Sequence, residues 1–252
     1  MKNILFFFSI PVAFLFLAID TEVGVLKQNE APVSNPAVVI QLFTSQGCSS
    51  CPPADKLLDE VKQTNKNVYV LSYHVDYWNR LGWKDPYSKK EYTNLQYQYG
   101  DKFNSRSVYT PQAVINGNEH FVGSNRTEMK SKLNTYLDKS AKNIIKVTDV
   151  KREGRGIRFN YGIQGEVDEK NIKFALVLNR KTTYVKTGEN RQRSLTNTNI
   201  VIQEINIPIS ENPTGKGQVI IPESIDIESQ MHIIAFIQDK NLVIDGATRF
   251  DI

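Results

Sequence analysis

The chain has 252 residues, with 31 Lys and Arg against 27 Asp and Glu and a formal net charge of +4 at pH 7. This length exceeds a typical domain of roughly 100–150 residues and is enough to bury a full hydrophobic core. Charges of both signs are interspersed rather than gathered in one block, which argues against a nucleic-acid partner. We therefore expect either two folded domains or one enlarged domain.

The N-terminal residues match the pattern of a secretory signal. Lys2 precedes an almost unbroken apolar run over residues 4–19, as in the basic and apolar regions of such signals. We expect residues 1–20 to be a signal peptide or an uncleaved N-terminal anchor, and residues 21–36 to be a linker. The predicted location is the periplasm or cell envelope, or outside the cell. Only an uncleaved segment would contact a membrane.

Residues 37–142 carry the pattern of alternating strands and helices. An apolar run over 37–43 predicts a buried strand, residues 54–65 have apolar side chains at helical spacing, and 68–75 predict a second strand. A strand, helix and strand in this order predict parallel pairing. The same region further predicts an aromatic-rich insertion over 76–87, a helix over 88–103, a hairpin at Asn116-Gly117 and a helix that Ser124 caps.

Residues 143–252 lose the helical pattern. Strands are predicted over residues 144–151, 157–162, 173–179, 200–206, 218–221, 231–238 and 242–250. Seven strands without a helix predict a β-sandwich. The expected architecture is an α/β domain over residues 37–142 followed by an all-β sandwich-like domain over 143–252.

The two cysteines of the chain, Cys48 and Cys51, lie between the first predicted strand and the first predicted helix. A bridge across so short a loop stabilises a fold by only about 1.9 kcal/mol in the chain-entropy model, against about 4.7 kcal/mol for a hundred-residue loop. Thiols at the start of a helix favour the thiolate, the form that attacks disulfides and binds metals. In an oxidising compartment the pair therefore indicates redox or metal chemistry.

Two prolines follow the cysteine pair. Proline is tolerated best in the first turn of a helix, so we expect the regular helix to begin near Pro52 or Pro53. Cys48 then lies in a turn before the helix, and Asp55 lies one turn further on. Both features weaken the expected stabilisation of a thiolate.

The order of these elements resembles thioredoxin and its relatives, in which a Thr-Pro bond precedes the final hairpin and helix. The matching residues are Thr110 and Pro111. The resemblance implies a thioredoxin-like fold for residues 37–142 and a cis Thr110–Pro111 bond beside the cysteines. Pro111 therefore joins the candidate site.

A closer resemblance is to the DUF1223 family of exported thioredoxin-like proteins, whose function is uncharacterised. The segments that carry it are LFTSQGCSSCPPAD at 42–55, HVDYW at 74–78, LGWKDP at 81–86, YTPQ at 109–112, NG at 116–117, GEN at 188–190 and NIV at 199–201. It covers nearly the whole chain after the N-terminal segment. The resemblance implies a fold and export but no reaction.

Three functions remain open. In a thiol–disulfide oxidoreductase, which needs no cofactor, the more exposed Cys48 would attack a protein or small-thiol substrate and Cys51 would resolve the mixed disulfide. In a metallochaperone-like protein, Cys48, Cys51 and His74 would bind Cu(I) or zinc. In a binding module, the pair would be a structural disulfide and the β-domain would hold the partner. Asp76 is the residue that could instead fix His74 in a structural role.

Two further features have plain structural interpretations. The aromatic residues around Trp78 and Trp83 are expected mainly to pack in the core, with substrate contact as the alternative. Residues 189–191 are expected to be a polar turn rather than a binding loop.

Overall fold

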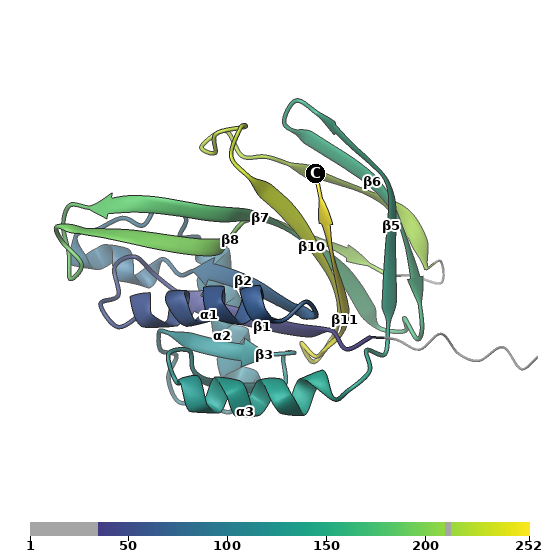
Figure 1. Ribbon diagram of the computed structural model, residues 1–252, viewed down its shortest axis with the longest axis horizontal. Helices are drawn as coiled ribbons and strands as arrows, with labels where there is room; N and C mark the ends of the chain where they lie inside the picture. Colours follow the sequence, from purple (N-terminus) through teal and green to yellow (C-terminus); the bar gives the residue numbers. More distant parts are fainter. Residues whose placement is uncertain (1–34, 210–212) are drawn as a thin grey trace, which may run out of the picture. The chain divides into compact units, whose positions relative to one another are not determined.

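The computed structural model describes residues 35–209 and 213–252, all of which fall in one compact unit (Figure 1). The signal or anchor expected over residues 1–20, and the linker up to residue 34, lie outside the described residues. Within the described ranges, no helix has the length and apolar character needed to cross a bilayer.

The described residues form two sheets, three α-helices and one 3-10 helix. The elements up to residue 142 are β1 (Val38–Thr44), α1 (Pro52–Thr64), β2 (Val68–His74), η1 (Tyr77–Leu81), α2 (Lys90–Lys102), β3 (Gln112–Ile115), β4 (Glu119–Val122) and α3 (Arg126–Leu137). The strands after residue 142 are β5 (Ile144–Glu153), β6 (Gly156–Gln164), β7 (Lys170–Val185), β8 (Arg193–Pro208), β9 (Thr214–Ile220), β10 (Met231–Asp239) and β11 (Ile244–Asp251).

Most individual elements confirm the sequence pattern. β1 pairs with β2 in parallel across the α1 crossover, and α1 begins at Pro52 as its two prolines predict. Asn116 and Gly117 both have positive φ, 45° and 67°, as the hairpin turn requires. The cap of α3 differs from the prediction, because Asn125 rather than Ser124 accepts a hydrogen bond from a backbone N–H of the first helical turn.

Eight strands join in a single mixed sheet in the order β11-β10-β7-β8-β2-β1-β3-β4. The junction between the two halves of the chain is the parallel pairing of β2 with β8, through Ser72 and Ile200. Only β5, β6 and β9 form a separate, three-stranded sheet. The boundary expected between residues 142 and 143 falls just before β5.

The expected fold class, a thioredoxin-like α/β domain followed by an all-β sandwich, is therefore wrong. Four strands of the second half continue the sheet begun in the first half instead of building a sandwich of their own. The physical reason is an open strand edge: the β-α-β unit leaves one side of β2 unpaired, and the long strand β8 occupies it.

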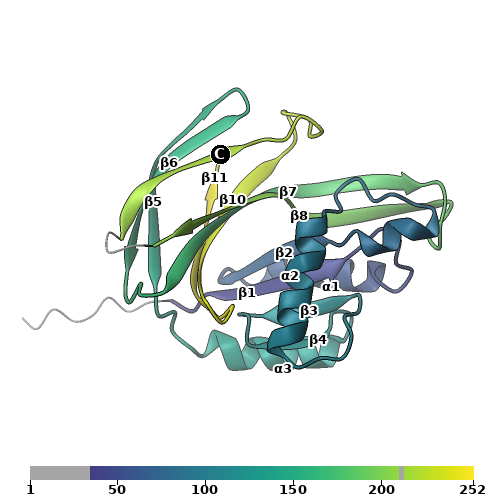
Figure 2. The same cartoon turned by 180° about the vertical axis from the view of Figure 1, so that it is seen from behind.

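The two faces of β1 pack against different layers because successive side chains point to opposite sides of a strand. Val38, Ile40 and Leu42 pack toward α1 and α3, which cover one face of the sheet (Figure 1). Val39 and Phe43 lie in the cluster that includes α2 on the other face (Figure 2). That second cluster also contains side chains of β7 and β10, so the halves of the chain share a core.

Candidate functional site

The cysteine pair lies where the chain leaves β1 and enters α1. Cys48 and Cys51 form a disulfide, with their Cα atoms 5.5 Å apart. Cys51 is the N-cap residue of α1, and its carbonyl oxygen accepts hydrogen bonds from the N–H groups of Ala54 (2.9 Å) and Asp55 (3.2 Å). The two prolines between them occupy the first helical positions, where a missing N–H leaves no helical hydrogen bond unmade.

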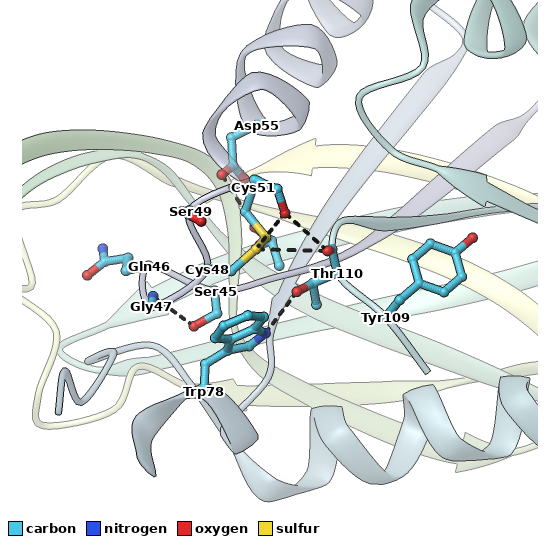
Figure 3. The surroundings of a disulfide bond; sticks show 12 residues. Ser45, Gln46, Gly47, Cys48, Ser49, Cys51, Asp55, Trp78, Tyr109 and Thr110 are labelled. Atoms are coloured by element: carbon cyan, nitrogen blue, oxygen red, sulfur yellow. Dashed lines mark hydrogen bonds between the residues drawn. A yellow bond between two sulfur atoms is a disulfide. The ribbon is translucent and has the colours of Figure 1, made fainter. Parts of the chain in front are cut away.

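The disulfide is enclosed although the turn that carries it is not. Cys48 and Cys51 are both 0% exposed, whereas Ser49 and Ser50 are exposed. The expectation that Cys48 is the more exposed cysteine is therefore wrong. The hydroxyl of Ser50 lies 3.3 Å from Cys48 Sγ and also donates to the carbonyl oxygen of Thr110 at 3.4 Å (Figure 3).

Thr110 and Trp78 close the remaining side of the disulfide. The Thr110–Pro111 bond is cis, the geometry that the resemblance to thioredoxin implied. The indole Nε1 of Trp78 donates to Thr110 Oγ1 at 2.8 Å, and Figure 3 shows the ring on the Cys48 side of the bridge. Trp78 therefore contacts the cysteine loop while it also packs against the apolar cluster that includes α2.

The turn between β7 and β8 contacts the cysteine loop, which runs from Gln46 to Cys51, through hydrogen bonds. Asn190, fully buried, donates from Nδ2 to the carbonyl oxygens of Gln46 (3.0 Å) and Cys48 (2.9 Å). Glu189 accepts a hydrogen bond from the backbone N–H of Ser49 at 3.0 Å. Arg193 fixes the amide by donating to Asn190 Oδ1 at 2.7 Å. What the sequence presents as a polar turn is therefore a clamp on the cysteine loop.

Asp55 is a buried carboxyl group one turn after Cys51 and on its side of the bridge (Figure 3). Its Oδ2 accepts hydrogen bonds from Thr44 Oγ1 and from Asn197 Nδ2, each at 3.3 Å. Its Oδ1 has no partner among the described residues. Burial raises the pKa of Asp55 to about 7, against the opposing effect of a positive charge on His74.

His74 and Asp85 form a fully buried pair at the end of β2. His74 Nδ1 lies 2.7 Å from Asp85 Oδ2, which also accepts from the N–H of Gln46 at 2.8 Å. Burial lowers the pKa of His74, but the charge and hydrogen bond of Asp85 outweigh it, so the pKa is raised. Burial raises the pKa of Asp85, but His74 and two backbone N–H groups bring it below its usual value.

Asp76, the partner expected for His74, lies elsewhere. It accepts a hydrogen bond from Thr93 Oγ1 at 2.6 Å, and Asp85 takes the place predicted for it. The other ring nitrogen, His74 Nε2, is buried without a partner in the described part of the chain. Asp55 and His74, which influence each other's pKa, thus each carry one buried polar atom without a partner among the described residues.

A line of amide side chains joins the aromatic insertion to Asp55. Trp83 Nε1 donates to Gln46 Oε1 at 3.2 Å, and Gln46 Nε2 donates to Asn197 Oδ1 at 2.9 Å. Asn197 in turn donates to Asp55. Because each amide passes on a hydrogen bond, β8 and the insertion together orient the carboxyl group beside Cys51.

The three proposed metal ligands are not arranged as a set. Cys48 and Cys51 are bonded to each other, and His74 uses one ring nitrogen for Asp85. Across residues 35–209 and 213–252, no three side chains of His, Cys, Asp or Glu converge as metal ligands. Copper or zinc binding stays a prediction.

The sequence interpretation missed Gln46, Asp85, Asn190 and Asn197 as members of the site. All four are buried polar residues, and two of them come from the β7–β8 hairpin, more than a hundred residues after the cysteines. Gln46, Asp85 and Asn190 lie in segments that resemble a known family, at residues 42–55, 81–86 and 188–190, but Asn197 lies outside every such segment.

The model of the family described as "Protein of unknown function (DUF1223)" matches residues 39–238. The chain belongs to the DUF1223 family. A crystal structure of a protein from Agrobacterium tumefaciens, a structural-genomics target, is similar over 86% of this chain and 94% of that chain, with 27% identity and a TM-score of 0.66.

Other solved structures are much less similar to this DUF1223 protein. A DUF3823 family protein from Bacteroides ovatus has 16% identity and a TM-score of 0.28, over 43% of this chain and 52% of that one. A domain of the outer membrane lipoprotein Omp28 from Porphyromonas gingivalis has 12% identity and a TM-score of 0.25, over 44% and 88%. No curated protein matches the chain.

Proposed function

We propose that this DUF1223 protein is a thiol–disulfide oxidoreductase whose reactive group is the Cys48–Cys51 disulfide. The observation that carries the proposal is the buried carboxyl group of Asp55 beside Cys51, with a pKa of about 7 and an unpartnered oxygen. Burying such a group destabilises a fold, and a structural disulfide has no use for it. Titratable groups perturbed in this way gather at functional sites.

The reaction needs a proton when the disulfide opens. A thiolate of the substrate attacks Cys48 Sγ, a new S–S bond forms to Cys48, and the electron pair of the broken bond goes to Cys51 Sγ. Protonated Asp55 gives its proton to this sulfur, and solvent reprotonates the carboxylate. A second substrate thiolate then attacks the mixed disulfide, so the substrate leaves as a disulfide and Cys48 leaves as a thiolate.

Two contacts favour Cys48 as the attacked sulfur. It lies beneath the side chain of the exposed Ser50, whereas Cys51 lies on the side of the buried Asp55. Rotation of one serine side chain together with release of the Asn190 clamp would open a path to Cys48. The N-terminal pattern supports an exported protein, so the expected substrates are thiols or disulfides of the cell envelope.

Trapping of a mixed disulfide tests this function. Cys51→Ser, reduced and then exposed to glutathione disulfide, is expected to retain glutathione on Cys48, because no resolving thiol is present. Cys48→Ser is the matched control, and its Cys51, on the side of the buried Asp55, should react at least tenfold more slowly. Intact-protein mass spectrometry measures both. Absence of an adduct on Cys51→Ser, or equal rates in the two variants, would contradict the proposal.

A further inference from the structure

A polar pocket lies at the opposite end of α1 from the disulfide. It has a volume of about 330 Å³ and lies between the last turn of α1, the first residues of β2, and strands β10 and β11. The polar side chains that matter for its chemistry are those of Lys62, Lys66, Tyr69, His232, Thr248 and Arg249. This volume suits a small molecule or a single charged group.

The pocket carries positive charge that nearby carboxylates do not balance. Among the described residues no Asp or Glu lines it. Lys62 Nζ contacts a neutral partner, Asn199 Oδ1. Arg249 pairs at 3.0 Å with Asp251, whose side chain is 83% exposed, so this pair is weak.

The charged form of Lys62 is destabilised in this pocket. Burial lowers the pKa of Lys62, and the positive charges of Arg249 and Arg180 lower it further. Only Asp59 opposes them, and that carboxylate pairs with Arg180 at 2.6 Å. An anion in the pocket would relieve the repulsion between Lys62 and Arg249.

His232 adds a hydrogen-bond acceptor to the positively charged pocket. Its Nδ1 faces Asn179 Oδ1 at 2.5 Å, and because that oxygen only accepts, Nδ1 carries the proton. Nε2 is therefore an acceptor, and it is buried without a partner among the described residues. Burial, with the charges of Arg249 and Lys62, lowers the pKa of His232 to about 3. An anion that reaches Nε2 must therefore also donate a hydrogen bond to it.

We propose that this pocket binds a phosphate group that retains one protonated oxygen. The P–OH group donates to His232 Nε2, and the charged oxygens accept from Lys62 and Arg249, with Lys66 and the two hydroxyls at the rim. Inorganic phosphate keeps such a proton at neutral pH, whereas sulfate does not. The same chemistry occurs in free phosphate and in a phosphomonoester lipid headgroup. The site shares no residue with the disulfide, so it stands apart from the redox proposal.

Calorimetric titration of the full chain with phosphate and with sulfate at matched ionic strength and pH 7 tests the site. We expect phosphate to bind at least tenfold more tightly than sulfate. Lys62→Met should weaken phosphate binding at least tenfold, and His232→Gln should reduce the preference for phosphate over sulfate. Lys181→Gln removes a charge from an exposed position on β7 and should change binding less than twofold.

Vesicle sedimentation identifies the source of the phosphate group. Vesicles that contain phosphatidic acid present a phosphomonoester, and phosphatidylglycerol vesicles of equal charge present a diester without a P–OH group. Lys62-dependent binding of inorganic phosphate in the calorimetry names free phosphate as the source, and Lys62-dependent binding to phosphatidic acid vesicles but not to phosphatidylglycerol vesicles names a lipid headgroup; Lys62-dependent binding to both vesicle types would contradict the need for a P–OH group. Equal binding of sulfate and phosphate, or the absence of Lys62-dependent binding both to inorganic phosphate and to phosphatidic acid vesicles, would overturn the proposal. If His232→Gln does not fold, Lys62→Met and the sulfate comparison still decide.

Discussion

In the proposed reaction, Asp55 is the residue that supplies the proton to the cysteine pair. A carboxyl group beneath a disulfide could be paired with a cation, but here its hydrogen bonds come from a neutral hydroxyl and a neutral amide. It is 5% exposed, so water does little to stabilise the anion. Asp55 therefore holds its proton up to about neutral pH, beside the sulfur that would accept a proton in the proposed reaction.

The raised pKa of Asp55 predicts a pH dependence of stability. The pKa is near 3.8 when the chain is unfolded and about 7 in the fold, so the folded protein holds a proton that the unfolded chain releases in between. Stability is therefore expected to fall as pH rises from about 4 to about 7, by up to about 4 kcal/mol. Asp55→Asn removes this loss, and urea unfolding of the oxidised proteins at pH 4.5, 6 and 8 measures it.

The exposed Asp101 provides the control for this measurement. Asp101→Asn removes a carboxylate from the surface of α2, and its stability should follow the wild-type pH profile. The gap between Asp55→Asn and wild type should widen steadily up to pH 7 and then stay constant. A constant gap from pH 4.5 to pH 8 would mean that Asp55 is already ionised in the fold.

His74 predicts a second effect at the residue scale. With both side chains 0% exposed, removal of the imidazole leaves Asp85 as a buried, unpaired charge. His74→Leu is expected to destabilise the protein by about 3–5 kcal/mol, while the double variant His74→Leu/Asp85→Leu recovers part of that loss. Thermal unfolding of the two variants tests this. If His74→Leu is as stable as wild type, the contact of His74 with Asp85 does not stabilise the fold.

At the scale of elements, the β7–β8 hairpin contributes the Asn190 and Glu189 contacts that hold the cysteine loop. Asn190→Ala removes two hydrogen bonds and leaves the buried carbonyl oxygens of Gln46 and Cys48 without these donors, at a cost of about 1–3 kcal/mol per group. Reduction of the disulfide by dithiothreitol should become at least several-fold faster, because the cysteine loop is released. Thiol release measured over time gives the rate.

Asn206→Ala tests whether this effect belongs to the clamp. Asn206 is exposed on β8, so its loss should change neither the rate of reduction nor the stability measurably. Equal reduction rates for Asn190→Ala and wild type would show that the clamp does not control access to the disulfide.

Elements were largely predictable from the sequence, but the contacts between them were not. Local structure was predictable where the signal lies within a few residues of the element it determines. The apolar run of β1, the prolines of α1 and the Asn116-Gly117 turn are examples. Asn190 and Asn197 contact residues more than a hundred positions earlier in the chain. Nothing in the local sequence distinguishes such a buried asparagine from an asparagine in a surface turn. Asp85 was missed for a similar reason, because Asp76 is nearer to His74 in sequence.

At the scale of the whole molecule, the two halves of the chain share the eight-stranded sheet and one of the apolar clusters. The pairing of β2 with β8 could not be predicted, because a free strand edge does not specify its partner. The fully buried Phe236 of β10 lies in the same apolar cluster as Val39 and Tyr73 of the first half. A substitution that destabilises one half should therefore also destabilise the other.

Phe236→Ala tests this coupling. The cavity is expected to destabilise the protein by about 3–5 kcal/mol and to lower the hydrogen-exchange protection of β1 and β2 amides together with those of β10. Leu133→Ala in α3, whose cluster includes side chains of β1 and β2 but none of β10, is the comparison. Loss of protection confined to β7, β10 and β11 would mean that the halves unfold independently.

A redox titration of the Cys48–Cys51 pair tests the central claim most directly. The protein is equilibrated in buffers of defined dithiothreitol or glutathione poise, the free thiols are alkylated, and the reduced fraction is read from the mass shift. We predict reversible conversion with a midpoint between about −270 and −120 mV, the range of enzymes that exchange disulfides. A midpoint below about −300 mV, where structural disulfides lie, would contradict the account.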